Sequence, residues 1–175
     1  MSARLRWLSS GLIVLVASLG LLISPLLAKG TLDIIAKFQQ STFELAVATY
    51  TDPDAKPGKV GLVGLTAGQV KNSFAFDGPQ WSKLIDLIAK AEKAQSTGKT
   101  WTVTGEMTET ETSDVSHLVI SAGPGIRFAL NSQKGASLTY ILAKSDIAQL
   151  QQALARVHQY LTDALRPALL SSAAR

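Results

Sequence analysis

Two stretches of this chain decide its fold: residues 73–94, SFAFDGPQWSKLIDLIAKAEKA, and residues 139–160, TYILAKSDIAQLQQALARVHQY. Each begins as a β-strand, and its apolar residues then recur at the three- and four-residue spacing of a helix. In the first stretch the sequence predicts Pro79 at the first helical position, where its missing N–H has no cost. In the second, Ser145 is expected to cap the helix. The stretches therefore predict one strand-to-helix unit in each half of the chain.

These stretches belong to longer segments that match when the chain is shifted by 66 residues, the distance from Ser73 to Thr139. Apolar positions then stay in register without a gap over two strands and a helix, while the first two strands of each half do not align. Sequence identity is almost absent, so a true duplication and a chance match of two equally long units both stay open. The matched pairs are Val60–Ile126, Leu62–Phe128, Phe74–Tyr140, Phe76–Leu142, Trp81–Ile147, Leu84–Leu150, Ile88–Leu154 and Ala91–Val157.

Segments rich in β-branched and aromatic residues predict four strands ahead of each helix. In the third of them, Gly61 and Gly64 would weaken a central strand, so we expect a bulge or an edge position there. The expected strands cover residues 31–38, 42–50, 60–65, 70–76, 99–110, 115–122, 126–131 and 136–143.

The segment KTWTVTGEMTET, residues 99–110, alternates between apolar and polar residues, which is typical of a half-exposed strand. Its apolar face is expected to hold Trp101, Val103 and Met107. The opposite, exposed face is expected to hold Thr102, Thr104, Glu106 and Thr108.

The order of elements predicts an α+β fold of two pseudo-symmetric ββββα units, residues 31–96 and 97–162, within one domain at residues 29–165. Neither half can cover its own sheet well, so we expect antiparallel sheets packed with the two helices about a pseudo-twofold axis. Residues 166–175 are expected to form a flexible tail.

This order of elements resembles the Whirly and PUR-repeat proteins, relatives of the PC4 coactivators. The stretch SFAFDGPQWSKLIDLIAKA is similar to the last strand and helix start of PC4 and PUR units, where a strand runs into a short polar turn and an aromatic residue opens the helix. The resemblance implies a sheet surface suited to stacking single-stranded nucleic acid, and often an oligomer. It transfers no individual binding residue to this chain.

Residues 1–28 are predicted to be a secretory signal peptide. Two arginines precede the uncharged apolar run at residues 11–23, and Ala28 offers a small residue for cleavage. A retained membrane anchor is the alternative, because residues 8–27 are long enough for a bilayer core of ~30 Å. Pro25, close to the proposed cleavage point, favours a cleaved signal. In both cases we expect the remainder to be exported, periplasmic or secreted, with membrane contact only if the leader is retained.

The composition, with 46% hydrophobic and 17% charged residues, fits one folded domain with an apolar leader and excludes a disordered chain. Arg4 and Arg6 supply two of the four net positive charges. The mature domain is therefore nearly neutral, which does not favour general binding to phosphate backbones.

The chain has no cysteine, and this excludes disulfides, thiolate metal sites and a cysteine nucleophile.

No residue pattern in the sequence indicates catalysis. His117 and His158 belong to different elements, and His158 more simply complements a helix dipole. Glu106, Glu109, Glu111 and Asp114 lack the spacing of a calcium loop and indicate a solvated acidic hairpin. We therefore predict a protein that is not an enzyme and that uses no cofactor or metal.

The remaining prediction is an exported binding module that recognises a protein or an envelope component and that self-associates as a homodimer. A sheet with exposed edges can pair with a partner strand, and the threonine-rich segment at residues 102–112 is the expected surface. The alternative is single-stranded nucleic-acid binding, with Tyr50, Phe74 or Tyr140 stacking on bases if they are exposed. Phe74 and Tyr140 belong to the matched apolar register, which favours a place in the core for both. The candidate surface residues for either partner are Lys71, Lys99, Thr102, Thr104, Arg127 and Lys134.

Overall fold

A computed structural model describes residues 30–54, 58–111, 114–132 and 137–163. The predicted leader at residues 1–28 and the predicted tail at residues 166–175 lie outside these ranges. No helix in the described part of the chain combines the length and the apolar character needed to cross a membrane.

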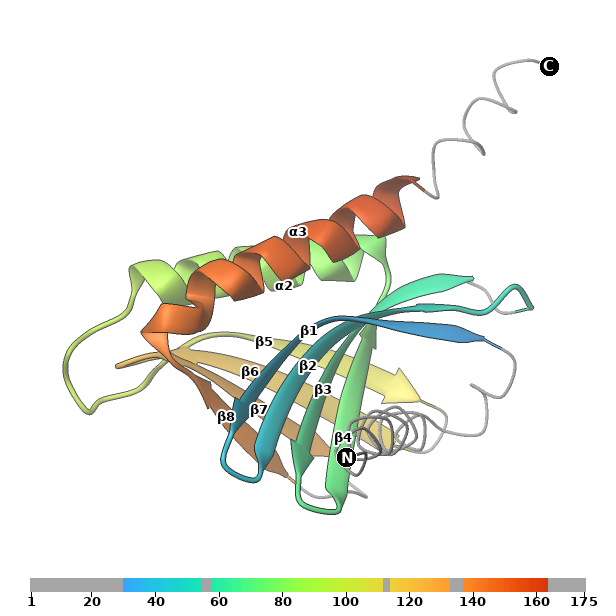
Figure 1. The fold of residues 1–175 in the computed structure, drawn as a ribbon. Helices are drawn as coiled ribbons and strands as arrows, with labels where there is room; N and C mark the ends of the chain where they lie inside the picture. Colours follow the sequence, from blue (N-terminus) through green and yellow to red (C-terminus); the bar gives the residue numbers. More distant parts are fainter. Residues whose placement is uncertain (1–29, 55–57, 112–113, 133–136, 164–175) are drawn as a thin grey trace, which may run out of the picture.

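Each half of the chain folds into a four-stranded antiparallel sheet followed by a helix, which confirms the predicted α+β fold (Figure 1). Within each sheet, the strands lie side by side in chain order. The first half contains β1 (Thr31–Gln40), β2 (Phe43–Thr51), β3 (Lys59–Ala67), β4 (Val70–Phe76) and α2 (Gly78–Lys93). The second half contains β5 (Thr102–Glu111), β6 (Asp114–Ala122), β7 (Ile126–Ser132), β8 (Leu138–Leu142), a 3₁₀ turn (Lys144–Asp146) and α3 (Ile147–Asp163).

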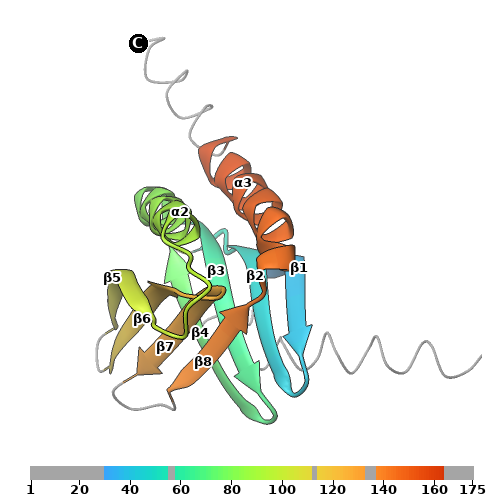
Figure 2. The same ribbon diagram turned by 90° about the vertical axis from the view of Figure 1, so that its left-hand side faces the viewer.

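Both helices lie on the same side of the molecule, above the two sheets (Figures 1 and 2). Each helix packs mainly on the sheet of the other half: α2 contacts β5 and β6, while α3 contacts β1, β2 and β3. The inner faces of both sheets and the apolar stripes of both helices form one continuous core. The halves therefore complete each other, as the sequence predicted.

Trp81 is the largest side chain at the centre of this core and is fully buried. Its indole ring packs edge-on against Phe76, with 5.6 Å between ring centroids. Its Nε1 donates a hydrogen bond of 3.1 Å to the carbonyl of Leu154. Because Trp81 belongs to α2 and Leu154 to α3, this buried bond joins the two halves of the chain.

The prediction of a bulge or an edge at Gly61 and Gly64 is wrong, because β3 is a central strand with a continuous register to both neighbours. A Cβ atom on Gly61 would lie 2.4 Å from Cε3 of Trp81 and 2.8 Å from Cγ1 of Val157. Gly61 is therefore present because two helices pack directly on the strand at this point.

The bulges occur instead in the first strand of each half, at the same place. The register of β1 on β2 shifts between Ile34 and Ala36, and the register of β5 on β6 shifts between Val103 and Gly105. In both sheets the residue before the bulge begins a row of four directly paired residues on the outer face. We call these the first row, Ile34–Ala48–Leu62–Ala75, and the second row, Val103–Ser121–Arg127–Ile141.

The strand pairing shows that the predicted alignment of the two halves is wrong by one residue in the third strand. Phe76 pairs with Gly61, and its counterpart Leu142 pairs with Ile126. Ile126 therefore corresponds to Gly61 rather than to Val60, and the matched positions Val60 and Leu62 lie on the outer face of the first sheet. The shift by 66 residues holds in the fourth strand and the helix but fails in β3. There the alignment is wrong by one residue, and in a strand a one-residue error matches inward-facing residues with outward-facing ones.

Both predicted helix starts differ slightly from the structure. Asp77 is the N-cap of α2 and accepts a hydrogen bond from the Gln80 amide, so Gly78 is the first helical residue and Pro79 the second. Ser145 does not cap α3, because it lies inside the 3₁₀ turn and donates to Asp146. The predicted apolar stripe of α3 is buried as expected: Ile147, Leu150, Leu154, Val157 and Leu161.

Candidate functional site

The outer face of the second sheet carries the most distinctive cluster of side chains in the described structure. It consists of the second row and Trp101, which directly precedes β5. Strand alternation directs the side chains of the second row away from the helices, because the neighbouring positions Ala122, Phe128 and Leu142 are buried in the core. We call this group the Trp101–Arg127 cluster.

Arg127 occupies the centre of the Trp101–Arg127 cluster. Its guanidinium carbon lies 5.0 Å from the centroid of the Trp101 ring, a cation–π arrangement. Its Nη2 donates a hydrogen bond of 3.2 Å to Oγ of Ser121, which is fully buried. Its Nε is also buried and has no hydrogen-bond partner among the described residues. The guanidinium is thus fixed in orientation and keeps a donor unused.

The turn between β6 and β7 makes room for this arrangement. A Cβ atom on Gly123 would lie 2.8 Å from the Trp101 ring, so only glycine lets the ring lie flat on the turn. The Gly123 amide donates to the carbonyl of Gly125 at 3.1 Å and closes the turn. Residues 121–125, SAGPG, therefore form a turn on which the Trp101 ring packs.

Two apolar side chains on either side of Arg127 are exposed to solvent. Val103 is 59% exposed and Ile141 is 42% exposed, and both belong to the second row. Tryptophan and arginine are enriched at the energetic centre of protein interfaces, and exposed apolar side chains grouped with them favour a binding surface.

A polar group continues the same face toward the other end of β5. Oε1 of Glu106 lies 2.6 Å from Nδ1 of His117, and Oγ1 of Thr108 lies 3.3 Å from the same nitrogen. His117 is therefore held by its neighbours, as an ordinary sheet residue would be. Within the ranges that the structure describes, no three histidine or carboxylate side chains come close enough to hold a metal ion.

The structure does not bring the six predicted surface residues together. Lys71 lies on β4 of the first sheet, and Lys99 lies in the exposed loop before β5. Thr102 is exposed at the start of β5, whereas the hydroxyl of Thr104 donates to the Ile120 carbonyl at 3.0 Å. Of the six, only Arg127 belongs to the Trp101–Arg127 cluster, and Lys134 lies outside the described residues.

The bulge at Thr104 explains why the predicted faces of β5 were wrong. It adds one residue to the strand, so Val103 is exposed beside Glu106 while Met107 is 4% exposed and belongs to the core. Gly105 takes the inner position next to Met107, and a Cβ atom there would lie 2.2 Å from Leu87. A glycine within an alternating strand was the signal that could have located the bulge.

The aromatic residues proposed for base stacking are not available at the surface. Phe74 is fully buried, Tyr140 is 4% exposed and Tyr50 is 8% exposed. Burial raises the pKa of the Tyr50 phenol, and the nearby Asp52 carboxylate raises it further. Burial likewise raises the pKa of Tyr140, with added effects of Asp146 and Glu44.

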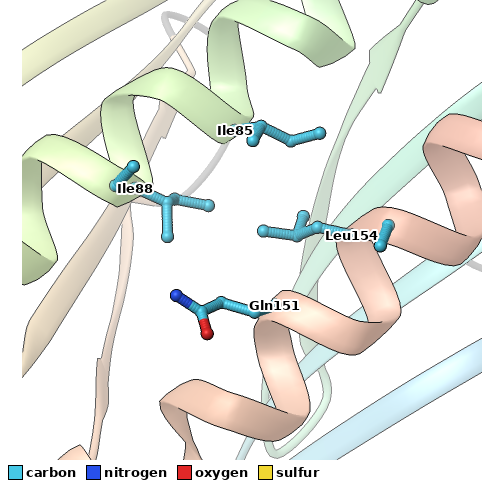
Figure 3. A pocket seen from close by; sticks show the side chains of 6 residues that line it. Ile85, Ile88, Gln151 and Leu154 are labelled. Carbon is cyan, nitrogen blue, oxygen red and sulfur yellow. The ribbon is translucent and has the colours of Figure 1, made fainter.

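A small apolar cavity of about 110 Å³ lies between α2 and α3 (Figure 3). Ile85 and Ile88 of α2 point toward Leu154 of α3 across it. Nε2 of Gln151 donates to a Glu92 carboxylate oxygen at 2.6 Å near this cavity. The cavity is a packing space between the helices and offers few polar groups for a ligand.

The fold resembles those of two solved plant proteins. WHY1 from Arabidopsis thaliana matches with a TM-score of 0.54 and 14% identity over 83% of this chain and 94% of that chain. The plant transcriptional regulator PBF-2 matches with a TM-score of 0.53 and 14% identity over 81% of this chain and 87% of that chain. These matches confirm the predicted Whirly-like fold. Comparisons with models of protein families and with curated protein sequences found no match.

Proposed function

We propose that this chain is an exported, non-catalytic binding module that recognises a protein partner through the Trp101–Arg127 cluster. The observation that carries the proposal is the pair of exposed apolar side chains, Val103 and Ile141, on either side of an arginine stacked on a tryptophan. The partner is an exported protein or an envelope component, and a second copy of the chain is one such protein. Export rests on the apolar leader at residues 1–28.

The state of the basic residues supports a protein partner over a phosphate backbone. Lys37 pairs with Glu44 at 3.2 Å, and the Lys59 ammonium lies 4.5 Å from the Tyr160 ring centroid. Lys71 also has an interaction partner within the chain. Cations that are already engaged have less to gain from replacing the counterions of a nucleic acid.

Single-stranded nucleic acid is the second candidate, and the Whirly-like fold together with the exposed part of the Trp101–Arg127 cluster favours it. An indole ring beside a guanidinium can accept a stacked base. Here the two candidates differ in salt dependence: binding to a phosphate backbone weakens steeply with salt, whereas burial of Val103 and Ile141 would not.

The deciding experiment places a photo-crosslinking amino acid at position 103 of the full chain in its host. A partner protein should be captured there, and Trp101→Ala and Arg127→Gln should each remove that product. Position 86, exposed on α2, is the matched control and should capture none. A product that survives both substitutions would contradict the proposed surface.

A parallel titration tests the second candidate. The full chain is mixed with labelled single-stranded DNA and RNA at several salt concentrations. Micromolar binding that falls steeply with salt and is lost in Arg127→Gln would favour nucleic acid, and its absence at low salt would leave the protein partner. Mass measurement of the same sample reports whether the chain self-associates.

A further inference from the structure

A second, more polar cavity lies at the junction of the two halves. It has a volume of about 300 Å³ and is lined by Gln95, Ser96, Thr97, Pro124 and Lys144. These residues come from the loop after α2, the turn between β6 and β7, and the 3₁₀ turn before α3. Its volume is at the lower limit for small-molecule sites, about 300 Å³.

The walls of this cavity are tied to one another and to the helix. The Ser96 amide donates to the Gly123 carbonyl at 3.1 Å, which fastens the loop to the turn. The Gln95 amide donates to the Glu92 carbonyl at 3.3 Å, which fastens the loop to the end of α2. The cavity is therefore held by backbone contacts, and its shape does not depend on exposed side chains alone.

The polar groups lining the cavity are mainly hydrogen-bond donors. Lys144 contributes an ammonium group, and Ser96 and Thr97 contribute hydroxyls. Nε2 of Gln95 is buried and has no hydrogen-bond partner among the residues that the structure describes. A buried donor without a partner carries a desolvation cost, and rotation of the Gln95 side chain toward the cavity would let a bound acceptor remove it. No carboxylate is among the lining residues.

The carboxylates closest in sequence to Gln95 and Lys144 are engaged with other groups. Glu92 accepts a hydrogen bond from Gln151 at 2.6 Å, and Asp146 accepts one from Ser145 at 3.0 Å. The carbonyl end of α2 contributes a partial negative charge of about one half. The full positive charge of Lys144 exceeds it, so this cavity favours an anion only while Lys144 is present.

We propose that this cavity binds an oxyanion group, a carboxylate or a phosphate, with Lys144 and Gln95 as its principal contacts. The two groups share the chemistry that the cavity recognises, because both present several acceptor oxygens to converging donors. The site lies across the Gly123 turn from Trp101 and does not depend on the proposed protein partner.

The test uses the full chain labelled with ¹⁵N, titrated with sodium phosphate or sodium acetate at constant ionic strength. The side-chain amide of Gln95 and the backbone amides of Ser96 and Thr97 should shift and saturate. Lys144→Gln should weaken binding by about tenfold, as expected for a lost charge-assisted hydrogen bond. Lys83→Gln, on an exposed site of α2 outside the cavity, should leave the binding curve unchanged. Tighter binding of one anion identifies the source of the group.

A second substitution, Gln95→Glu, tests the anion site independently of Lys144. Gln95→Glu places a carboxylate where the donor was and should abolish the saturable shifts of Ser96 and Thr97. Equal binding in wild type, Lys144→Gln and Gln95→Glu would overturn the site, as would shifts that follow total salt and never saturate.

Discussion

The first and second rows occupy the same position on the two sheets but have opposite character. Ala48 and Leu62 of the first row are 3% and 7% exposed within an apolar cluster. Their counterparts in the second row are Ser121 and Arg127, which hydrogen-bond to each other. A shared backbone thus supports an apolar row in one half and a polar, tryptophan-stacked row in the other. Function is expected where the halves differ, because the common features serve the fold.

The same correspondence continues along the outer faces. Lys37 of β1 pairs with Glu44 of β2, and the equivalent positions in the second sheet hold Glu106 and His117. Both halves therefore place an interacting pair at the same diagonal positions of their first two strands. The acidic residue lies on the second strand in the first half, as Glu44, and on the first strand in the second half, as Glu106. This placement follows from the common register that the two bulges establish.

The largest expected loss of stability comes from removing Trp81, which contacts both halves of the chain. Trp81→Ala should lower the free energy of unfolding by about 4 kcal/mol, because it leaves a large cavity and removes the bond to Leu154. Its counterpart in the second half, Ile147→Ala, should cost less, about 3 kcal/mol. Urea denaturation of both variants measures the difference, and an equal cost would contradict the central role given to Trp81.

Exchanging the side chains at equivalent positions of the two rows, Leu62 and Arg127, tests whether the first row is apolar and the second polar. Leu62→Arg would bury a charge without a partner and should lower the free energy of unfolding by about 3 kcal/mol. Arg127→Leu should cost only about 1 kcal/mol, mainly because the buried hydroxyl of Ser121 loses its donor. Chemical denaturation compares the two. If Leu62→Arg were as well tolerated as Arg127→Leu, the first row would be far more accessible than its burial indicates.

The strand pattern of the sequence was enough to predict both sheets and both helices, since the change from alternation to helical spacing at Asp77 is a local signal. The rows could not be predicted in this way. Ser121, Arg127 and Ile141 become neighbours only through pairing between strands, and the bulge at Thr104 reverses the face of Val103. Gly61 was misread for a similar reason, because Trp81 of α2 and Val157 of α3 reach this strand position only in the folded chain.

A smaller effect on stability is expected at alkaline pH. Burial holds the pKa of Tyr50 above its ordinary value of 10.0, so the neutral phenol is favoured in the folded state. Its contribution is fully present below pH 10 and is lost as the pH rises through the folded pKa. Stability should therefore decline above about pH 10, and Tyr50→Phe should reduce the decline. A decline that is unchanged in Tyr50→Phe would show that other groups cause it.

The smallest effects should come from the two cross-strand pairs. Side chains of Lys37 and Glu44 are 23% and 17% exposed, whereas those of His117 and Glu106 are 36% and 51% exposed. Double-mutant cycles should give a coupling of about 1 kcal/mol for the first pair and no more than about 0.5 kcal/mol for the second. Stronger coupling in the second pair would indicate a tighter structure on that face than its exposure suggests.

The exchange of helices between the halves has a consequence for how the chain reaches its native state. Over β1 and β2 the first sheet is covered by α3, the last element of the described chain, so this part of its inner face lacks its helix until residues 147–163 have been synthesised. Trp81 and Leu154 are 73 residues apart, and such distant contacts slow folding. A growing chain would leave this apolar part of the first sheet exposed until its last helix is formed. Successful folding therefore requires that aggregation be prevented during this interval, either by holding the chain unfolded or by rapid release of its C-terminus.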